Sequence, residues 1–538
     1  MARVSAALAL IVAVAAGMLL VSGGSDSDPR TPAGLPGLPA PFLGIAVVGD
    51  GGLTAAVDAY GDVVDLRASP AGPPLQAVAA ARQAAGTVAP AMAIVPRLRL
   101  GNGRWLPFWR ADAVAQRYLP GTNVLETTAR FGALWASVAY FARGDVLGCR
   151  AEVEDSARMR VSLGGASNAV RRHLRCDAAG DSAAMVAAAR SDRRWLHTSA
   201  PLARSAPAWA KRMYGRSLLT LRALTDRRTG AVAAGARDGW AYVWPRDASA
   251  AAQALATAGH RSEAQRIVRF LLRLDLGAAA RFDGSGSPIP GRGPQGDAAG
   301  WVAVAAGKAN ATGGRAAGNQ SESNRTVGSA RAVRADRAFA GGHSASWRDR
   351  PDYQEKAPGN YLGNAIAATA TEPSAKRAAA ARAIARAFGG RRGLDRVAGD
   401  PGSGLDSAAA WAVRPFALPR LYPSARGTLR QLLARSGRFG IVPSDDWPDP
   451  DPWSAPTAWS AWAFAALARA ERRQGDSALA SADRRDALAL LADLRRAATS
   501  AGELPERVDA VSGNPRSTTP LAWSHAFAVL ALRELWAN

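Results

Sequence analysis

The sequence predicts a chain of two parts, an N-terminal antiparallel β-sandwich followed by a helical α/α barrel. Three observations support this fold class. Short segments with alternating apolar residues recur between residues 42 and 200, helical spacing of apolar residues replaces them from about Ala206, and 538 residues suffice for two domains with separate cores. A content of 48% hydrophobic and 21% charged residues is typical of a globular protein.

Residues 1–24 predict a signal peptide or a membrane anchor. Met-Ala-Arg precedes an apolar run from Val4 to Ser22, which is near the length that spans a bilayer. Ala13–Ala15 has the small-x-small form of a cleavage site but lies inside the run, so cleavage and retention both stay open. Residues 25–41, rich in Pro, Gly, Ser and Asp, read as a linker. We therefore expect an exported protein, extracellular or anchored facing outside.

The β-sandwich is expected over residues 42–200. Its predicted strands alternate apolar residues and are separated by turn-forming residues. They are Gly44–Val48, Gly51–Asp58, Gly61–Leu66, Thr122–Phe131, Leu134–Phe141 and Cys149–Glu154. Such strands at short intervals favour an antiparallel sandwich. Cys149 and Cys176 permit a disulfide in an exported protein, and two separate thiols are the alternative.

The helical part is expected over residues 206–538. Its predicted helices, each with apolar residues at helical spacing, are Ser217–Leu224, Ala248–Ala258, Glu263–Leu274, Asn364–Ala370, Ala378–Phe388, Ser407–Val413, Thr428–Ala434, Ala458–Ala470, Arg484–Ala498 and Trp523–Leu535. Short helices joined by long loops fit an α/α barrel, in which the loops at one end form a pocket. Ala303–Ser346 has little apolar periodicity and is predicted to be a long surface loop.

The formal charge of +23 comes from basic residues spread along the whole chain. A solvated surface explains this charge, and adhesion to an anionic polymer is the functional alternative. No helix-turn-helix, zinc finger or compact basic block is present, which argues against nucleic-acid binding. Five His and two Cys have no zinc-type spacing. We therefore expect no metal and no cofactor.

Two segments combine carboxylates with tryptophans in a loop that ends at a helix. The first is Asp-Gly-Trp-Ala-Tyr-Val-Trp-Pro-Arg-Asp at Asp238–Asp247. The second runs from Gly-Glu-Leu-Pro-Glu-Arg-Val-Asp at Gly502–Asp509 to Thr-Pro-Leu-Ala-Trp-Ser-His-Ala at Thr519–Ala526. Aromatic rings stack on sugar faces, while carboxylates and Arg bind hydroxyls. Carboxylates also perform glycoside hydrolysis, one as acid and one as base.

Both segments resemble glycoside hydrolase family 15, the glucoamylase-like and glucodextranase-like enzymes. Their order, separation and helical setting carry the resemblance, which runs over most of Ala208–Trp536 and is weak between about Ala303 and Ser346. It implies an (α/α)6 barrel catalytic domain preceded by the β-domain of the bacterial members. It also implies inverting, exo-acting hydrolysis of terminal α-linked glucose.

By this resemblance, Glu506 of the Leu-Pro-Glu segment is the general base. Relatives carry Gln after this Glu, where this chain has Arg507. Glu355 is the predicted general acid, because Asp352 and Glu355 keep the family's Asp-x-x-Glu spacing and few other Glu residues lie nearby. The usual Trp before the acid is Gln354 here. A charged residue at a helix start, beside Lys356, is the structural alternative for Glu355.

The resemblance also predicts substrate-binding residues. Arg246 and Asp247 match the family's sugar-binding pair, and Trp240 and Trp244 are expected in the pocket wall. The alternative for Asp247 is a structural one, as N-cap of the helix Ala248–Ala258. The remaining predicted ligands are Asp352, Arg438 and Trp453. Glu503 lies near the base but off the motif, so no role is predicted for it.

The sequence leaves the substrate open among α-1,4 glucan, α-1,6 glucan and trehalose. The other class of function is a carbohydrate-binding or cell-envelope protein that kept the fold and lost catalysis. Gln354, Arg507 and the Ala303–Ser346 segment motivate this alternative.

Overall fold

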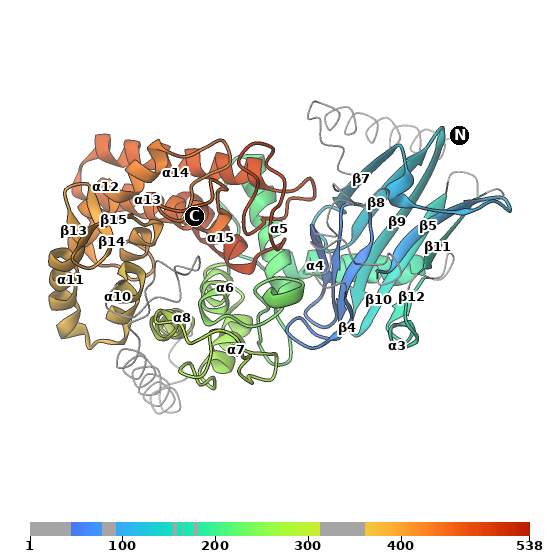
Figure 1. The fold of residues 1–538 in the computed structure, drawn as a ribbon, viewed down its shortest axis with the longest axis horizontal. Helices are drawn as coiled ribbons and strands as arrows, with labels where there is room; N and C mark the ends of the chain where they lie inside the picture. Colours follow the sequence, from blue (N-terminus) through green and yellow to red (C-terminus); the bar gives the residue numbers. More distant parts are fainter. Residues whose placement is uncertain are drawn as a thin grey trace.

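The computed structural model describes residues 45–77, 93–153, 159–164, 166–176, 181–311 and 361–537. It shows an elongated molecule with β-strands at one end and helices at the other (Figure 1). The fold class predicted from the sequence is confirmed: an N-terminal β domain precedes a helical barrel domain.

Three sheets make up the described part of the β domain. The first has the order β1-β2-β3-β4, the second β12-β10-β9-β8-β7 and the third β11-β5-β6. The strands are β1 (Ala46–Gly49), β2 (Thr54–Val57), β3 (Val63–Arg67), β4 (Pro74–Ala77), β5 (Val95–Leu100), β6 (Trp105–Pro107), β7 (Ala113–Tyr118), β8 (Leu125–Phe131), β9 (Leu134–Arg143), β10 (Val146–Val153), β11 (Met159–Gly164) and β12 (Leu174–Arg175). Pairing is antiparallel except between β10 and β12.

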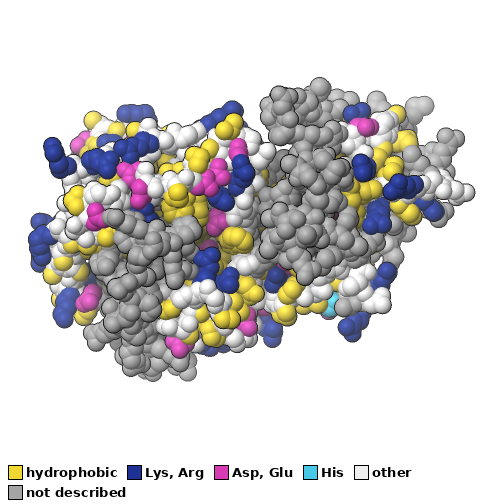
Figure 2. All heavy atoms as spheres, viewed as in Figure 1, with side chains coloured by type: hydrophobic (Ala, Val, Ile, Leu, Met, Phe, Trp, Pro, Cys, Tyr) yellow, Lys and Arg dark blue, Asp and Glu magenta, His cyan; other side chains and the backbone are white. Residues whose placement is uncertain are grey.

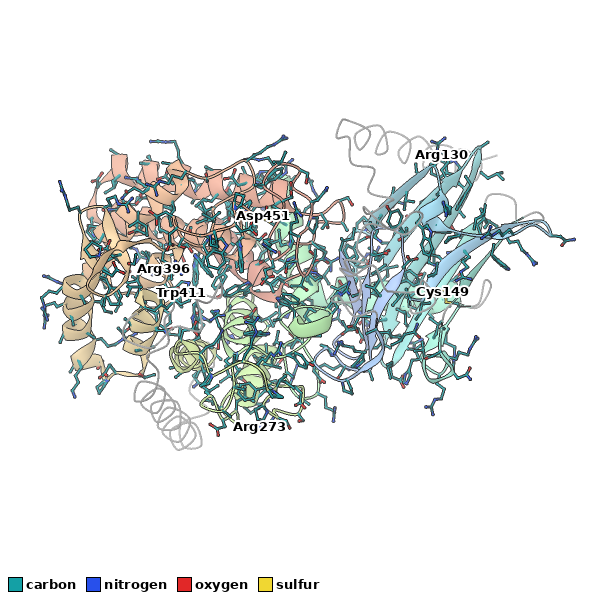
Figure 3. The ribbon with its side chains drawn as sticks, in the orientation of Figure 1. Arg130, Cys149, Arg273, Arg396, Trp411 and Asp451 are labelled. Carbon is teal, nitrogen blue, oxygen red and sulfur yellow. A yellow bond between two sulfur atoms is a disulfide. The ribbon has the colours of Figure 1, made fainter. Side chains whose placement is uncertain are left out.

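Cys149 on β10 and Cys176 after β12 form a disulfide with their Cα atoms 4.7 Å apart. The bond joins two neighbouring strands of the central sheet, where Cys149 is labelled in Figure 3. This settles the question that the sequence left open. The short helix α3 (Asn168–Arg171) lies between the two bonded strands in the chain.

The inner elements of the helical domain follow one another around a closed ring: α6, α8, α10, η7, α13 and α15, with α15 returning to α6. Their bounds are α6 (Pro245–Thr257), α8 (Ala298–Ala311), α10 (Leu362–Ala368), the 3-10 helix η7 (Ser407–Ala412), α13 (Ser454–Gln474) and α15 (Ala522–Trp536). The outer helices that cover them are α5 (Ala208–Leu224), α7 (Arg261–Leu271), α11 (Ser374–Phe388), α12 (Tyr422–Ala434) and α14 (Ser477–Ala497). The outer helices α7, α11, α12 and α14 each follow the inner element that they cover, whereas α5 packs on α15 from the other end of the helical domain's sequence.

Aromatic side chains fill the middle of this ring. Trp411 of η7 packs edge-to-face against Trp301 of α8 at 5.1 Å and against Trp459 of α13 at 5.4 Å, measured between ring centroids. Trp459 in turn contacts Trp523, at the start of α15, at 5.3 Å. Trp411, labelled in Figure 3, lies near the centre of the helical domain. These contacts connect inner elements that are far apart in the sequence.

Three local expectations were wrong. The helix α4 (Asp181–His197) packs on β9 and β10 within the range expected to hold strands. The range Ala303–Ser346 was expected to be a loop, but α8 extends to Ala311, and residues 312–346 lie outside the described residues. A three-stranded antiparallel sheet of β13 (Gly389–Gly390), β14 (Gly393–Val397) and β15 (Asp400–Leu405) was not predicted.

The helix α5 carries the contact between the two domains. The side-chain amide of Asn123, in the β7–β8 loop, donates to the backbone carbonyls of Gly49 and Leu219 at 2.9 and 3.0 Å. Arg216 of α5 donates to the carbonyl of Thr122 at 2.9 Å. Because Asn123 and Arg216 are largely buried, these polar contacts fix how the β domain meets the barrel.

Candidate active site

The backbone around Glu506 is held from both sides. The Glu506 N–H donates to the Thr518 carbonyl at 2.9 Å, and its own carbonyl accepts from the Ser454 N–H at 2.9 Å. Trp453 and Arg507 pair as an isolated β-bridge. The loop that follows Pro505 is therefore fixed to the first residues of α13 on one side and to the strand-like segment before α15 on the other.

The Glu506 carboxylate receives a hydrogen bond on each oxygen. Trp240 Nε1–H donates to Oε1 at 3.2 Å, and Ser517 Oγ–H donates to Oε2. Trp240 belongs to the loop before α6, so residues 266 apart in the chain meet here. Two donors fix the orientation of the carboxylate while leaving it able to accept a proton from a further group.

The predicted sugar-binding pair lies in the first turn of α6. The helix begins at Pro245 with Trp244 as N-cap, so Asp247 is its third residue. The structural alternative, Asp247 as N-cap of a helix starting at Ala248, is wrong, because Pro245 is preset for the first helical position and starts the helix earlier. An acidic side chain in this turn also suits the helix dipole.

Asp247 is a buried carboxyl that faces other acids. Only 4% of its surface is exposed. Burial raises the pKa of Asp247 to about 7, with Glu506 and Asp297 adding to the rise and Arg246 opposing it. The electrostatic influence of Glu506 shows that the two carboxyls share one environment. An acid of this kind changes its charge near neutral pH.

Arg246 lies beneath the site with its guanidinium bound to protein groups. Its Nη1 donates to Asp297 Oδ2 at 2.5 Å and to Gln295 Oε1 at 3.3 Å. The guanidinium also lies 4.6 Å from the centre of the Trp523 ring. Arg246 thus joins the starts of α6, α8 and α15 at the floor of the site.

These groups surround a cavity of about 580 Å³ at the N-terminal ends of the inner helices. Six of the predicted site residues line it: Trp240, Trp244, Arg246, Asp247, Trp453 and Glu506. Asp451, labelled in Figure 3, belongs to the loop that forms one side. Carboxylates beside several indole rings are suited to a sugar, which presents hydroxyls at its edge and apolar C–H groups on its faces.

Among the described residues, one further predicted ligand lies outside this cavity. Arg438 is exposed and outside the cavity lining; its backbone carbonyl accepts from Arg496 Nε at 2.7 Å, and its guanidinium lies over the Phe439 ring. The structure therefore does not place Arg438 at this site. Asp352 and Glu355 lie outside the described residues, so the general acid remains a prediction from the sequence.

The sequence reasoning missed several lining residues. Trp447 was not predicted and packs edge-to-face against the predicted Trp453, with 5.5 Å between the ring centroids. Trp523 was not predicted either and forms part of the floor of the cavity. Arg281 and Arg292 line the cavity near Trp244, with the Arg292 guanidinium 5.4 Å from the centre of that ring. Trp523 stood within the Trp-Ser segment that suggested a sugar site, whereas Arg281 and Arg292 lie in a loop without any recognisable pattern.

Arg507, which stands where relatives carry Gln, forms an ion pair with Asp449, and both residues line the cavity beside Glu506. Arg507 also lies 3.9 Å from Asp451. Its charge is therefore balanced by the Asp-rich loop before α13. Within the described ranges, no group of three or more His, Cys, Asp and Glu side chains could hold a metal ion.

Comparisons with known proteins agree with this geometry. The model of the glycosyl hydrolases family 15 matches residues 208–275, which include α5, α6 and the Trp240–Asp247 segment. A bacterial glucoamylase solved in complex with acarbose superimposes with a TM-score of 0.62 at 12% identity, over 91% of this chain and 93% of that one. A sequence search of curated proteins finds no match.

Two further solved structures match a smaller share of the chain. A glycosidase variant in complex with glucose has a TM-score of 0.47 at 20% identity, over 61% of this chain and 97% of its own. The glucoamylase from Saccharomycopsis fibuligera has a TM-score of 0.47 at 13% identity, over 62% and 96%. The family-model match supports a glycoside hydrolase, and the bacterial glucoamylase has the same order of an N-terminal β domain and a helical barrel. Residues 208–275 resemble the glycosyl hydrolases family 15.

Proposed function

We propose that this protein is an exo-acting glycosidase that removes terminal α-linked glucose with inversion of configuration. The observation that carries the proposal is the paired setting of Glu506 and Asp247 in one tryptophan-walled cavity. Glu506 is the general base that deprotonates the attacking water, and Asp247 accepts hydroxyls of the terminal sugar. Glu355 supplies the proton to the leaving oxygen.

Inversion needs the acid and the base to lie about 6.5–9.5 Å apart, so that a water fits between base and sugar. The family resemblance supports this mechanism, and the burial of Asp247 in the cavity that Glu506 also lines supports exo-action. We further propose that the apolar run Val4–Ser22 exports the protein to act on α-glucans outside the cytoplasm. Among the described residues, no helix is long and apolar enough to cross a membrane.

The experiment measures glucose release by the wild type from a panel of maltose, isomaltose and trehalose. Proton NMR during the first minutes identifies the anomer, and β-glucose is expected first. Glu506→Gln should lower kcat about 10²–10⁴-fold, because a positioned base contributes that much. Glu152→Gln, an exposed carboxylate on β10, is the matched control and should retain full activity.

Early α-glucose would contradict inversion. A folded wild type that binds these sugars but releases no glucose would favour the alternative, a carbohydrate-binding protein on the same fold. A Glu506→Gln variant with a tenth or more of wild-type activity would remove Glu506 from the role of base.

A further inference from the structure

Glu503 lies three residues before Glu506 and is completely buried, with 0% of its surface exposed. It lies where the β domain meets the helical domain, between β7, α5 and α15. A buried carboxylate away from water is costly unless several groups bind it. The partners of Glu503 therefore indicate what this residue does.

Both carboxylate oxygens of Glu503 are bound by side chains from separate elements. Oε1 lies 2.7 Å from the hydroxyl of Tyr118, the last residue of β7, and 3.5 Å from Arg216 Nε on α5. Oε2 accepts from Thr220 Oγ1–H at 2.8 Å and lies 2.9 Å from His525 Nε2 on α15. One side chain thus joins the β domain to two helices of the barrel.

The charges in this cluster are balanced without bulk solvent. Burial raises the pKa of Glu503, but Arg216 and the hydrogen bonds from His525 and Tyr118 outweigh it, so its pKa lies below the usual range. Burial lowers the pKa of His525, so its ring stays neutral. The Arg216 guanidinium stacks 3.8 Å from the centre of the Tyr118 ring, which fixes the two partners relative to each other.

The segment between Glu503 and Glu506 is short and fully packed. Leu504 and Pro505 are buried; the Leu504 carbonyl accepts from the Leu521 N–H at 2.9 Å, and its N–H lies 3.0 Å from His525 Nε2. Pro505 also has a fixed φ. A displacement of Glu503 is therefore transmitted to Glu506 rather than absorbed by the loop.

We propose that Glu503 is a positioning residue for Glu506, and that the β domain takes part through the Tyr118 hydroxyl. The inference rests on the proposed function, because it assigns Glu503 to the loop of the proposed base. The β domain then contributes to catalysis by helping to position the proposed base. A misplacement of about 1 Å at a reacting group can lower the rate about 10²-fold.

The test uses the full-length protein with Glu503→Gln, which keeps the size of the side chain and removes its charge, and Tyr118→Phe, which removes only the hydroxyl. The matched control is Tyr140→Phe, because Tyr140 is a buried tyrosine of β9 whose hydroxyl donates to the Gly61 carbonyl at 2.9 Å, away from the base loop. The sugar released fastest by the wild type serves as substrate. Glucose titration by calorimetry gives the fraction of binding-competent sites.

We expect kcat per competent site to fall about 10-fold or more in both test variants, with KM changed less than about threefold. Tyr140→Phe should keep the wild-type kcat. A folding defect would lower the number of competent sites but not kcat per site. Wild-type kcat per site in both test variants would overturn the positioning role while leaving the proposed function intact; a wild type that releases no glucose, with Glu506→Gln identical to it, would overturn both.

Discussion

At the scale of single residues, Asp247 connects the electrostatics of the site to a measurable pH dependence. Its pKa is raised to about 7 by burial and by Glu506, so the free enzyme carries a neutral Asp247 below that pH. A neutral carboxyl accepts fewer sugar hydroxyls than a carboxylate. We predict that kcat/KM falls as the pH decreases through about 7, and that Asp247→Asn lowers kcat/KM throughout and removes this limb.

The measurement is the pH profile of kcat/KM for both proteins between pH 4 and 9. Because Asn has no titratable group but nearly the same shape, a limb that persists unchanged in Asp247→Asn must belong to another residue. Binding should release protons near pH 7, since sugar hydroxyls favour the ionised form. Calorimetry in two buffers of different ionisation heat detects this release.

Trp240 donates an indole hydrogen bond to Glu506 Oε1 at 3.2 Å. Trp240→Phe keeps an aromatic ring in the wall but removes the donor to Oε1. Hydrogen bonds to charged groups are worth about 1.5–3 kcal/mol, so we predict that kcat falls about 10- to 100-fold while KM changes less. Trp453→Phe, which lines the same cavity without a hydrogen bond to Glu506, should affect KM more than kcat. Equal effects of the two substitutions on kcat would contradict the role of the Trp240 N–H.

The sequence predicted much of the site at this scale because each key group lies in a short segment beside a helix start. Trp240, Asp247 and Glu506 could be named from such segments. Arg281 and Arg292 could not, since they reach the cavity only through the folding of long loops. Arg438 was wrongly predicted to line the site, because its neighbour Phe439 is buried and Arg438 is exposed.

At the scale of elements, apolar periodicity located the amphipathic helices but not those with unusual surroundings. The inner helix α8 is nearly apolar over its first part, so it has no polar face from which a helical period could be read. The helix α4 has a helical spacing of apolar residues, but it follows a series of strands in the chain, and its packing on β9 and β10 depends on the tertiary structure. Strand predictions were better, because turn-forming residues bound β1, β2 and β3.

The aromatic contacts at the centre of the ring make η7 an element whose loss should be costly. Trp411 is fully buried between Trp301 and Trp459. We predict that Trp411→Ala destabilises the protein by about 3–5 kcal/mol, because it removes a large side chain from a packed core. Trp105→Ala, at a half-buried position on β6, is the control and should cost less. Thermal unfolding at one scan rate measures the change in unfolding midpoint for both variants. Equal changes would show that Trp411 stabilises the protein no more than Trp105 does.

At the scale of the whole molecule, charge is distributed unevenly. In Figure 2, Lys and Arg side chains lie mostly along the outer edge of the helical half, and Asp and Glu side chains lie both at that edge and nearer its middle. The Lys and Arg side chains at this edge contribute to the formal charge of +23. An anionic surface such as a cell wall would be attracted to that periphery, while the cavity keeps a balance of carboxylates and guanidinium groups.

A pair of buried aspartates in the β domain is influenced electrostatically by Arg237, which lies in the loop that carries Trp240. Asp58 and Asp62, in the β2–β3 turn, are 2% and 0% exposed. Burial raises the pKa of Asp58 to about 7, while hydrogen bonds within the turn and the neighbouring Arg237 oppose it. Burial and the nearby Asp58 raise the pKa of Asp62 well above its usual range. Both carboxyls therefore hold protons in the folded protein at a pH at which they are ionised in the unfolded chain.

This shift predicts how the stability of the whole protein depends on pH. A raised pKa in the folded state favours folding at pH values below the unfolded pKa of about 3.8, and the benefit is lost as the pH rises through about 7.

The amide oxygen of Asp58→Asn can still accept from the Tyr60 and Asp62 N–H groups, which Asp58 Oδ1 binds at 2.9 Å. The variant removes one titration and one like charge. We therefore predict that the unfolding midpoint of Asp58→Asn, relative to the wild type, rises by roughly several degrees between pH 4.5 and 7.5. Asp145→Asn, an exposed position in the β9–β10 turn, should follow the wild type at each pH. A constant difference between Asp58→Asn and the wild type would show that the buried pair does not change its protonation on unfolding.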